Sequence, residues 1–198
     1  VMGVVALFWD APAHPNALMV LGASLAMFFV GIIDDRLQLT PLAKLLASLT
    51  VGAFLLYGLS TQPSLTLAWW QTVLLVILYA GIVHAFNLLD NMDGLAAGVA
   101  LLATLAFVLL FDVQLRPYFV VLLMAFGGSV GGFLVWNVRP ARLFMGDCGS
   151  LFLGSMVAGT GLCDFTGRLQ TGIALKEALL NAVFHGNLEI GREEIQAV

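Results

Sequence analysis

The stretch WQTVLLVILYAGIVHAFNLLDNMDG (residues 70–94) decides the class of this fold. Its first part, residues 70–89, contains no Asp, Glu, Lys or Arg, and a run of that length is long enough to cross a lipid bilayer as an α-helix. Asp90 and Asp93 follow directly, where such a helix meets water. The stretch therefore predicts a membrane span that brings polar groups to one membrane surface.

The rest of the chain is equally apolar. Of its 198 residues 61% are hydrophobic and 10% are charged, whereas about 25% are charged in a typical soluble domain. Lipid must therefore be the solvent for much of the surface. Four further charge-poor runs cover residues 16–33, 43–59, 94–111 and 118–136. A sixth run starts at Gly149 but reaches the charged Asp164. Residues 1–9 resemble the end of a truncated helix. We predict an all-α, polytopic transmembrane bundle of about five to six spans, followed by a short helical polar tail.

Charge and cysteine content exclude other classes. The net charge of −4 is scattered and includes no basic block, so no nucleic-acid partner is expected. Cys148 and Cys163 are isolated, which indicates neither a disulfide framework nor a zinc site. The chain begins at Val1 without a basic leader, and we therefore expect a processed protein or a fragment.

Counting the crossings predicts which loops share a side of the membrane. Segments 34–42, 90–93 and 137–148 fall on one side, and segments 60–69 and 112–117 fall on the other. The first side holds Arg36, Lys44, Arg139 and Arg142, whereas the second holds Arg116. By the positive-inside rule the first side is cytoplasmic, which places the chain in the inner (plasma) membrane with its acidic loops facing the cytoplasm.

Three polar clusters lie on that predicted side. The first is the adjacent pair Asp34 and Asp35 at the end of a span, and the second contains Asn87, Asp90 and Asp93 before Gly94. If the second cluster is helical, Asn87, Asp90 and Gly94 share one face.

The third cluster runs from Asn137 to Ser150 and includes Asp147, which we expect at the start of a helix. The N–H groups of a helix start favour phosphate, and a carboxylate there can hold the cation that phosphate brings. Oxygen ligands of this kind suit Mg²⁺, and Lys44 and Arg142 are placed to meet phosphate. The residues alone thus predict Mg²⁺-assisted handling of a phosphate at a membrane surface.

Each cluster also has a simpler interpretation. Asp34 and Asp35 alone fit a solvated helix end, and Asp90 or Asp93 alone fits a turn. His84 lies in an apolar run and is expected to be packed or hydrogen-bonded. Carboxylates in membrane proteins also form ion and proton pathways, so a transporter or channel is a rival, as is a non-catalytic remnant. The conjunction of three clusters on one face favours a site.

At these residues the chain resembles the polyprenyl-phosphate N-acetylhexosamine-1-phosphate transferases. The Asp34-Asp35 pair, the stretch from Phe86 to Ala96 and the stretch from Asn137 through Asp147 to Ser150 match in order, and the resemblance covers about residues 16–160. The wording of residues 87–98 favours the GlcNAc-1-phosphate branch, which serves O-antigen, teichoic acid or arabinogalactan synthesis, over the muramoyl-pentapeptide branch of peptidoglycan synthesis.

The resemblance implies transfer of a sugar-1-phosphate from a UDP-sugar to polyprenyl phosphate with release of UMP, and it admits a homodimer. It implies that Asp147 binds Mg²⁺ and that Asp34 and Asp35 bind or deprotonate the acceptor phosphate. By the same resemblance the nucleotide-sugar and phosphate contacts come from Lys44, Asn87, Asp90, Asp93 and Asn137. The family's early glycine-rich motif and late histidine cluster have no counterpart here, so residues 1–160 are expected to form a partial domain with weak or no activity.

The tail differs in character from the rest. Residues 161–198 are more polar, and the string from Ile173 to Glu189 has helical periodicity. It resembles the N-box helix of histidine-kinase-like ATPases, in which Asn181, with Glu177 nearby, is implied to hold Mg²⁺ on ATP. An amphipathic cytoplasmic helix is the alternative interpretation. If the resemblance to the N-box helix is real, a gene fusion or chimeric assembly near residue 160 would explain it.

Overall fold

The computed structural model describes residues 15–60, 69–110 and 117–163, and within these ranges it contains six α-helices and no β-strand. The helices are α2 (Pro15–Leu37), α3 (Pro41–Ser60), α4 (Trp69–Leu89), α5 (Leu95–Leu110), α6 (Pro117–Asn137) and α7 (Gly146–Cys163). The predicted all-α class is confirmed. The predictions for residues 1–9 and for the tail from 164 onward, Glu177 and Asn181 included, lie outside the described residues.

Four of the described helices, α2, α3, α4 and α6, are long and apolar enough to cross a membrane. Helix α5 is apolar but shorter. Large apolar side chains lie exposed around the bundle, among them Phe29, Phe54 and Leu109, as expected of a surface that faces lipid chains. The predicted polytopic membrane bundle is therefore confirmed.

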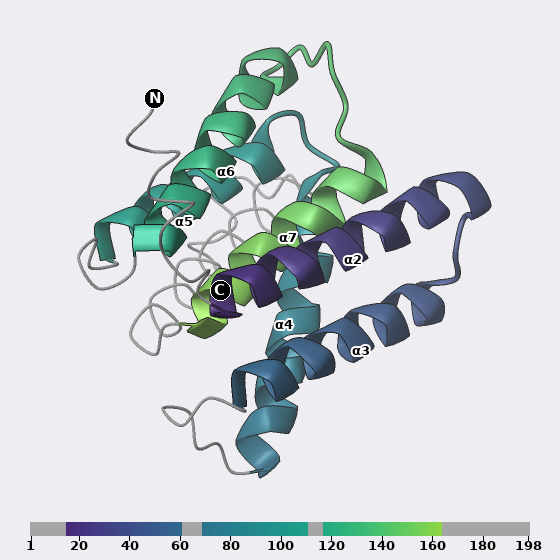
Figure 1. The fold of residues 1–198 in the computed structure, drawn as a ribbon. Helices are drawn as coiled ribbons and strands as arrows, with labels where there is room; N and C mark the ends of the chain where they lie inside the picture. Colours follow the sequence, from purple (N-terminus) through teal and green to yellow (C-terminus); the bar gives the residue numbers. More distant parts are fainter. Residues whose placement is uncertain (1–14, 61–68, 111–116, 164–198) are drawn as a thin grey trace, which may run out of the picture.

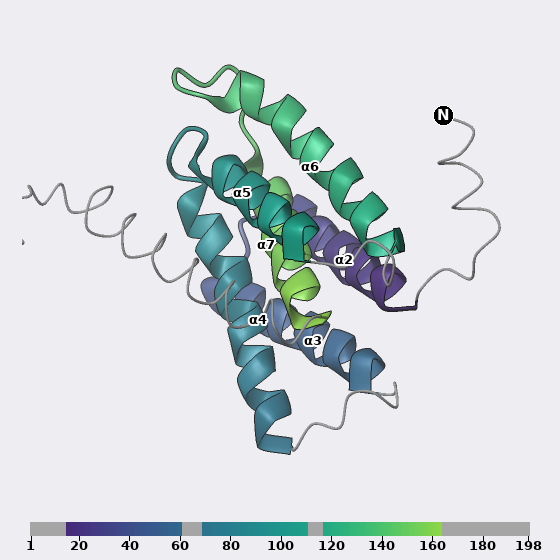
Figure 2. The same cartoon turned by 90° about the vertical axis from the view of Figure 1, so that its left-hand side faces the viewer.

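Helix α7 occupies the middle of the bundle. Helices α2 and α4 pack against it on two sides, α5 and α6 form a pair beyond it, and α3 closes the other edge against α2 and α4 (Figures 1 and 2). Its side chains are buried almost along its entire length. The sixth apolar run therefore forms a core helix, with other helices rather than lipid as its main neighbours.

Glycines let this central helix approach its neighbours closely. A Cβ atom at Gly154 would lie 2.8 Å from the Cα atom of Val83 in α4. A Cβ atom at Gly31 in α2 would lie 2.3 Å from the Cα atom of Cys148 in α7. Small residues at such contacts allow backbones to touch, which is how helices commonly associate in membranes.

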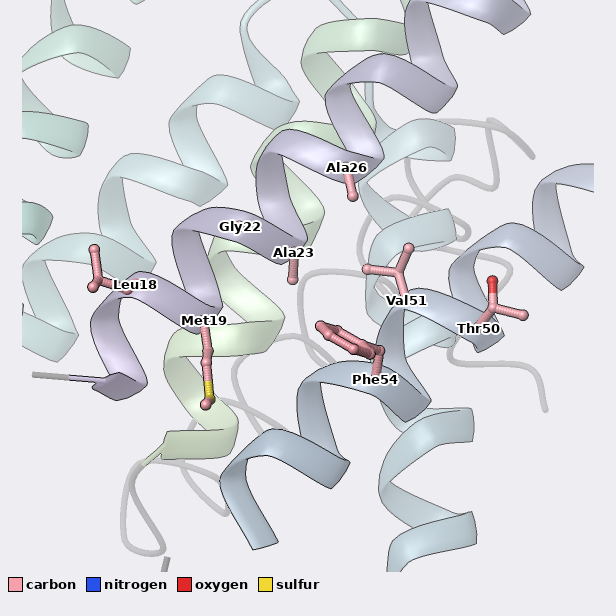
Figure 3. A pocket seen from close by; sticks show the side chains of 8 residues that line it. All are labelled: Leu18, Met19, Gly22, Ala23, Ala26, Thr50, Val51 and Phe54. Carbon is pink, nitrogen blue, oxygen red and sulfur yellow. The ribbon is translucent and has the colours of Figure 1, made fainter. Parts of the chain in front are cut away.

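An apolar groove of about 710 Å³ runs between α2 and α3 (Figure 3). Its lining residues are Leu18, Met19, Gly22, Ala23, Ala26, Thr50, Val51 and Phe54. Ala26 lies eight residues before Asp34, or about 12 Å along an α-helix, so the groove is separate from the polar end of the bundle. The side chains that line it are of the kind that lipid chains contact.

The three connections that carry the polar clusters meet at one end of the bundle. The backbone N–H of Gly94, between α4 and α5, donates to Asn137 Oδ1 at the end of α6 over 3.0 Å. The N–H of Asp147, at the start of α7, donates to Asp35 Oδ1 near the end of α2 over 2.9 Å. The predicted placement of residues 34–42, 90–93 and 137–148 on one side is confirmed by these contacts.

Candidate active site

The paired aspartates lie inside a helix rather than after it. The first span was predicted to end at residue 33, but α2 continues to Leu37 and contains both Asp34 and Asp35. Asp34 is 3% exposed. Its Oδ1 accepts a hydrogen bond from the backbone N–H of Leu39 over 2.8 Å, and its Oδ2 forms an ion pair with Lys44. Asp34 thus binds both the end of its own helix and the start of the next.

Asp35 caps the N-terminus of a different helix. Its Oδ1 accepts from the backbone N–H of Asp147 over 2.9 Å, and its Oδ2 accepts from that of Cys148 over 3.2 Å. The first N–H groups of a helix have no partners within it and carry a partial positive charge, so a carboxylate is stabilising there. These groups were predicted to favour phosphate; in the structure they donate to Asp35.

Asp147 joins three helices at the centre of the site. Its Oδ2 accepts from Lys44 Nζ of α3 over 2.9 Å, and its Oδ1 accepts from Asn87 Nδ2 of α4 over 2.8 Å. Asn87 Nδ2 also donates to Ser150 Oγ over 3.0 Å, one turn further along α7. The predicted helix start at Asp147 is confirmed, because α7 begins at Gly146, whose φ is +68°.

Lys44 lies in the first turns of α3, where a cation is unfavourable. Helix α3 begins at Pro41, and Thr40 Oγ1 accepts from the N–H of Ala43 over 3.3 Å as an N-cap. The positive end of the helix dipole repels an ammonium group, so Lys44 depends on the carboxylates of Asp34 and Asp147.

Asp90 lies in the turn after α4, because that helix ends at Leu89. The condition under which Asn87, Asp90 and Gly94 would share one helical face is therefore not met, and Gly94 has a φ of +75°. Burial, followed by the charges of Asp147 and Asp35, raises the pKa of Asp90 from its ordinary 3.8 to about 6. Three carboxylates are thus close enough to interact, although they come from three separate segments.

Asp93 and Asn137 form an adjoining cluster that organises the loops. Asn137 is 4% exposed; its Oδ1 accepts from Gly94 and its Nδ2 donates to the carbonyl of Leu143 over 2.9 Å. Asp93 Oδ2 accepts from the N–H of Ala141 over 3.2 Å. Both side chains therefore tie the turn after α4 to the loop before α7.

Arg142, predicted to help with phosphate, is exposed in that loop. Its backbone N–H donates to the carbonyl of Trp136 over 2.8 Å. Its role toward a phosphate stays a prediction, as do the substrate roles of the other site residues.

The donor chemistry fits a cation that brings most of its own ligands. Within the described ranges no three His, Cys, Asp or Glu side chains converge closely enough to hold a metal ion by themselves. Asp147 and Asp90 nevertheless supply carboxylates at this end of the bundle, and after burial the charge of Asp147 contributes to the raised pKa of Asp90. Mg²⁺ usually takes one or two carboxylates and completes its shell with water and substrate phosphates. The residues present are compatible with Mg²⁺ bound in that manner.

Two residues that contribute to the site, Ser150 and Gly31, were not predicted from the sequence. Ser150 is fully buried and accepts from Asn87, although it was quoted only as part of a motif. Gly31 lets the backbones of α2 and α7 touch, which brings Asp35 to the N-terminus of α7. The signal for Gly31 was available, because a glycine one turn before a carboxylate pair at the end of a span allows close helix packing.

Fold and site together define a class of protein: a polytopic membrane protein with a carboxylate-rich, lysine-containing site at one end of its bundle. The family model described as Glycosyl transferase family 4 matches residues 17–163, which contain every predicted site residue. The chain belongs to this family, which includes the polyprenyl-phosphate hexosamine-1-phosphate transferases.

Curated relatives agree with that assignment. The chain is 34% identical to the phospho-N-acetylmuramoyl-pentapeptide-transferase of Moorella thermoacetica over 74% of its length and 53% of the relative's. It is 37% identical to the Synechococcus sp. protein of the same name, over 86% of this chain and 55% of the relative. The Halalkalibacterium halodurans protein of that name is 32% identical over 74% and 51%. The chain thus spans about half the length of the curated relatives it matches.

Proposed function

We propose that this chain carries the active site of an enzyme that transfers a sugar-1-phosphate from a UDP-sugar to polyprenyl phosphate and releases UMP. The observation that supports this most is the network in which Asp34, Lys44, Asn87 and Asp147 meet from four helices at one end of the bundle. Phosphoryl transfer depends chiefly on positioning and on neutralising charge at phosphate oxygens. A lysine held in a fixed position between two carboxylates is suited to both tasks.

In this proposal the acceptor phosphate lies beside Asp34 and Asp35, and Lys44 offsets its charge. One acceptor oxygen forms a bond to the phosphorus that carries the sugar, and the bond from that phosphorus to UMP breaks. A direct attack and a two-step route through an aspartyl intermediate both leave the sugar-1-phosphate on the lipid. Asn87, Asp90, Asp93 and Asn137 shape the donor pocket.

We propose Mg²⁺ as the cofactor, held by Asp147 with the carboxylate of Asp90 nearby. When bound, Mg²⁺ neutralises the charge that develops on the transferred phosphate and on the leaving UMP. Asn87 and Lys44 orient the Asp147 carboxylate from both of its oxygens.

Two donors are candidates, and each has its own support. The amino-acid sequence of residues 87–98 resembles the GlcNAc-1-phosphate branch, which favours UDP-GlcNAc. The matched relatives carry the name phospho-N-acetylmuramoyl-pentapeptide-transferase, which favours the muramoyl-pentapeptide nucleotide. We propose that the site faces the cytoplasm of the bacterial inner membrane, where nucleotide sugars are found, in agreement with the basic residues on that side.

A transporter is the rival that the geometry disfavours. Binding sites of transporters lie near the bilayer midplane. Here Asp34 and Asp35 lie in the last turns of α2, and Asp147 lies in the first turn of α7. Carboxylates at helix ends are placed for substrates that arrive from water.

The test is lipid labelling. Membranes that contain the chain receive either radiolabelled UDP-GlcNAc or the radiolabelled UDP-muramoyl-pentapeptide, with polyprenyl phosphate and Mg²⁺, and label in the lipid fraction and UMP are measured. A chimaera of the Moorella relative in which residues 17–163 replace the matched segment supplies the other half of the protein. Labelling by one donor is expected. Absence of labelling and of UMP from both proteins with both donors contradicts the proposal.

A further inference from the structure

A hydrogen-bonded pair lies directly beneath the polar network, on the membrane side of it. His84 Nε2 of α4 and Ser48 Oγ of α3 are 3.1 Å apart, and Ser48 is fully buried. His84 was expected to be packed or hydrogen-bonded, and it is hydrogen-bonded. An ionisable side chain within a membrane helix is costly and commonly serves function.

The direction of this hydrogen bond follows from its surroundings. Ser48 Oγ also lies 2.8 Å from the carbonyl oxygen of Leu45, to which its hydroxyl donates its one proton. The hydroxyl can then only accept from the histidine, so Nε2 of His84 carries a proton. The resulting chain runs from His84 through Ser48 to the carbonyl of the residue that directly follows Lys44. Because Ser48 is buried and its proton is engaged, it is not placed to act as a nucleophile.

Both members of the pair share helix faces with groups that touch Asp147. Ser48 lies four residues after Lys44 on α3, and His84 lies three residues before Asn87 on α4. Residues at these spacings are neighbours on one helix face. The same face of α4 therefore contacts α3 through His84 and α7 through Asn87.

We propose that His84, acting through Ser48, is a positioning residue that fixes where the Lys44 ammonium group lies. The first turn of a helix lacks part of its internal hydrogen bonding, and the cap from Thr40 is exposed and 3.3 Å long. The hydrogen bond from α4 holds the second turn of α3 in place. Lys44 consequently keeps its contacts with Asp34 and Asp147. The consequence for catalysis rests on the proposed function; the consequence for the position of Lys44 does not.

The first test follows Lys44 and His84 directly by NMR in detergent micelles at pH 8. The chain contains two lysines, Lys44 and Lys176, so lysine labelled with ¹³C at Cε gives two signals, which Lys176→Arg assigns. Labelling with ¹⁵N-histidine reports the tautomer, and His84→Gln assigns the His84 signals.

The expected wild-type result is an Nε2–H tautomer of His84. Ser48→Ala should shift both the His84 ring signals and the Lys44 signal. Ser129→Ala is the matched control, because Ser129 donates to the Ala125 carbonyl within its own helix over 2.8 Å and is exposed. An Nδ1–H tautomer, or a Lys44 signal that does not move in Ser48→Ala, overturns the proposal.

The second test measures kcat and KM in whichever protein, chain or chimaera, shows transfer. Ser48→Ala and His84→Leu should each lower kcat about ten-fold, a modest fraction of the barrier, with the donor KM changed less than two-fold. The double variant should be no slower than either single variant, and His84→Gln, which keeps an N–H donor, should recover most of the rate. Lower thermal stability with unchanged kcat, or additive losses, overturns the proposal.

The two proposals fail separately. If neither the chain nor the chimaera shows transfer with either donor but the NMR signals behave as described, the transferase proposal fails and the positioning of Lys44 stands. If transfer is observed and the Lys44 NMR signal does not shift in Ser48→Ala, only the positioning proposal fails.

Discussion

Substituting Gly31 with alanine should separate α2 from α7 and dismantle the site from a distance. A Cβ atom at this position would lie 2.3 Å from Cys148 Cα, 2.6 Å from the Asp147 carbonyl oxygen and 2.6 Å from Cys148 N. All three are backbone atoms, so no side-chain rotation relieves the clash. Ordinary contact begins at 3.4 Å, and the helices must therefore move apart locally by about 1 Å.

The energetic cost follows from that displacement. Asp35 lies one turn after Gly31, and its bonds to the α7 N–H groups are 2.9 and 3.2 Å long. Lengthening both by about 1 Å takes them out of hydrogen-bonding range. Overpacking costs about 1–3 kcal/mol, and each hydrogen bond to a charged group contributes about 1.5–3 kcal/mol. Alanine regains about 1 kcal/mol of helix propensity, which leaves a net loss of about 3–8 kcal/mol.

The control is Gly22→Ala in the same helix, where an added Cβ atom meets nothing within 4 Å; Gly22 is one of the residues that line the groove of Figure 3. Both variants gain the same propensity, so their difference isolates the clash. The propensity gain cancels between the two variants, so their difference is about 4–9 kcal/mol. Thermal unfolding of the three proteins, followed by tryptophan fluorescence in one detergent at one scan rate, should therefore place Gly31→Ala about 8–36 °C below Gly22→Ala. A difference below about 2 °C would refute the close contact between α2 and α7.

Three other substitutions test individual parts of the site. Because the pKa of Asp90 is raised to about 6, its ionisation costs stability as pH rises from about 4 to 6. Asp90→Asn should therefore raise the free energy of unfolding at pH 7 by up to about 3 kcal/mol, seen as a higher unfolding temperature, but should not raise it at pH 4. Equal shifts at both pH values contradict this. Asn137→Ala removes the partners of the Gly94 N–H and the Leu143 carbonyl, both in part-buried hydrogen bonds, and should cost about 1–3 kcal/mol, against under about 0.5 kcal/mol for the exposed Asn91→Ala, measured by thermal unfolding. Asp147→Ala should abolish lipid labelling at every Mg²⁺ concentration; activity that still depends on Mg²⁺ removes Asp147 from the ligand role.

The helices could be predicted because the signal for a span is local. A charge-free run of sufficient length identifies a membrane helix without knowledge of its neighbours. Helix ends were less well predicted. The first span was predicted to end at residue 33, just before the first charged residue. Helix α2 instead continues for another turn and contains Asp34 and Asp35. A helix whose end faces water has no reason to stop at its first carboxylate.

The burial of α7 was harder to predict, because its sequence is an apolar run like those of the other helices. What separates it is its content of small residues, such as Gly154, Ser155 and Gly159, which permits close neighbours on every side. Tyr79 Oη and Ser155 Oγ, 2.6 Å apart and buried, join α4 to α7 in the same region. A hydropathy pattern records that a segment avoids water, and it does not record whether lipid or protein replaces the water.

The site shows the same limit at the level of single groups. Residue type and loop placement predicted that the aspartates at 34–35, 90–93 and 147 would meet. The structure joins Asp34, Asp35 and Asp147 through hydrogen bonds and Lys44, and it places Asp90 where burial and the charges of Asp147 and Asp35 raise its pKa. Asp93 instead contacts Ala141 in the adjoining loop cluster. The partner of each carboxylate was not predictable, because it depends on which helices are neighbours. Asp34 and Asp35 are adjacent in sequence, yet successive residues of a helix point about 100° apart. One therefore reaches Lys44 of α3 while the other reaches the N-terminus of α7, and a motif written as a pair of identical residues performs two different tasks.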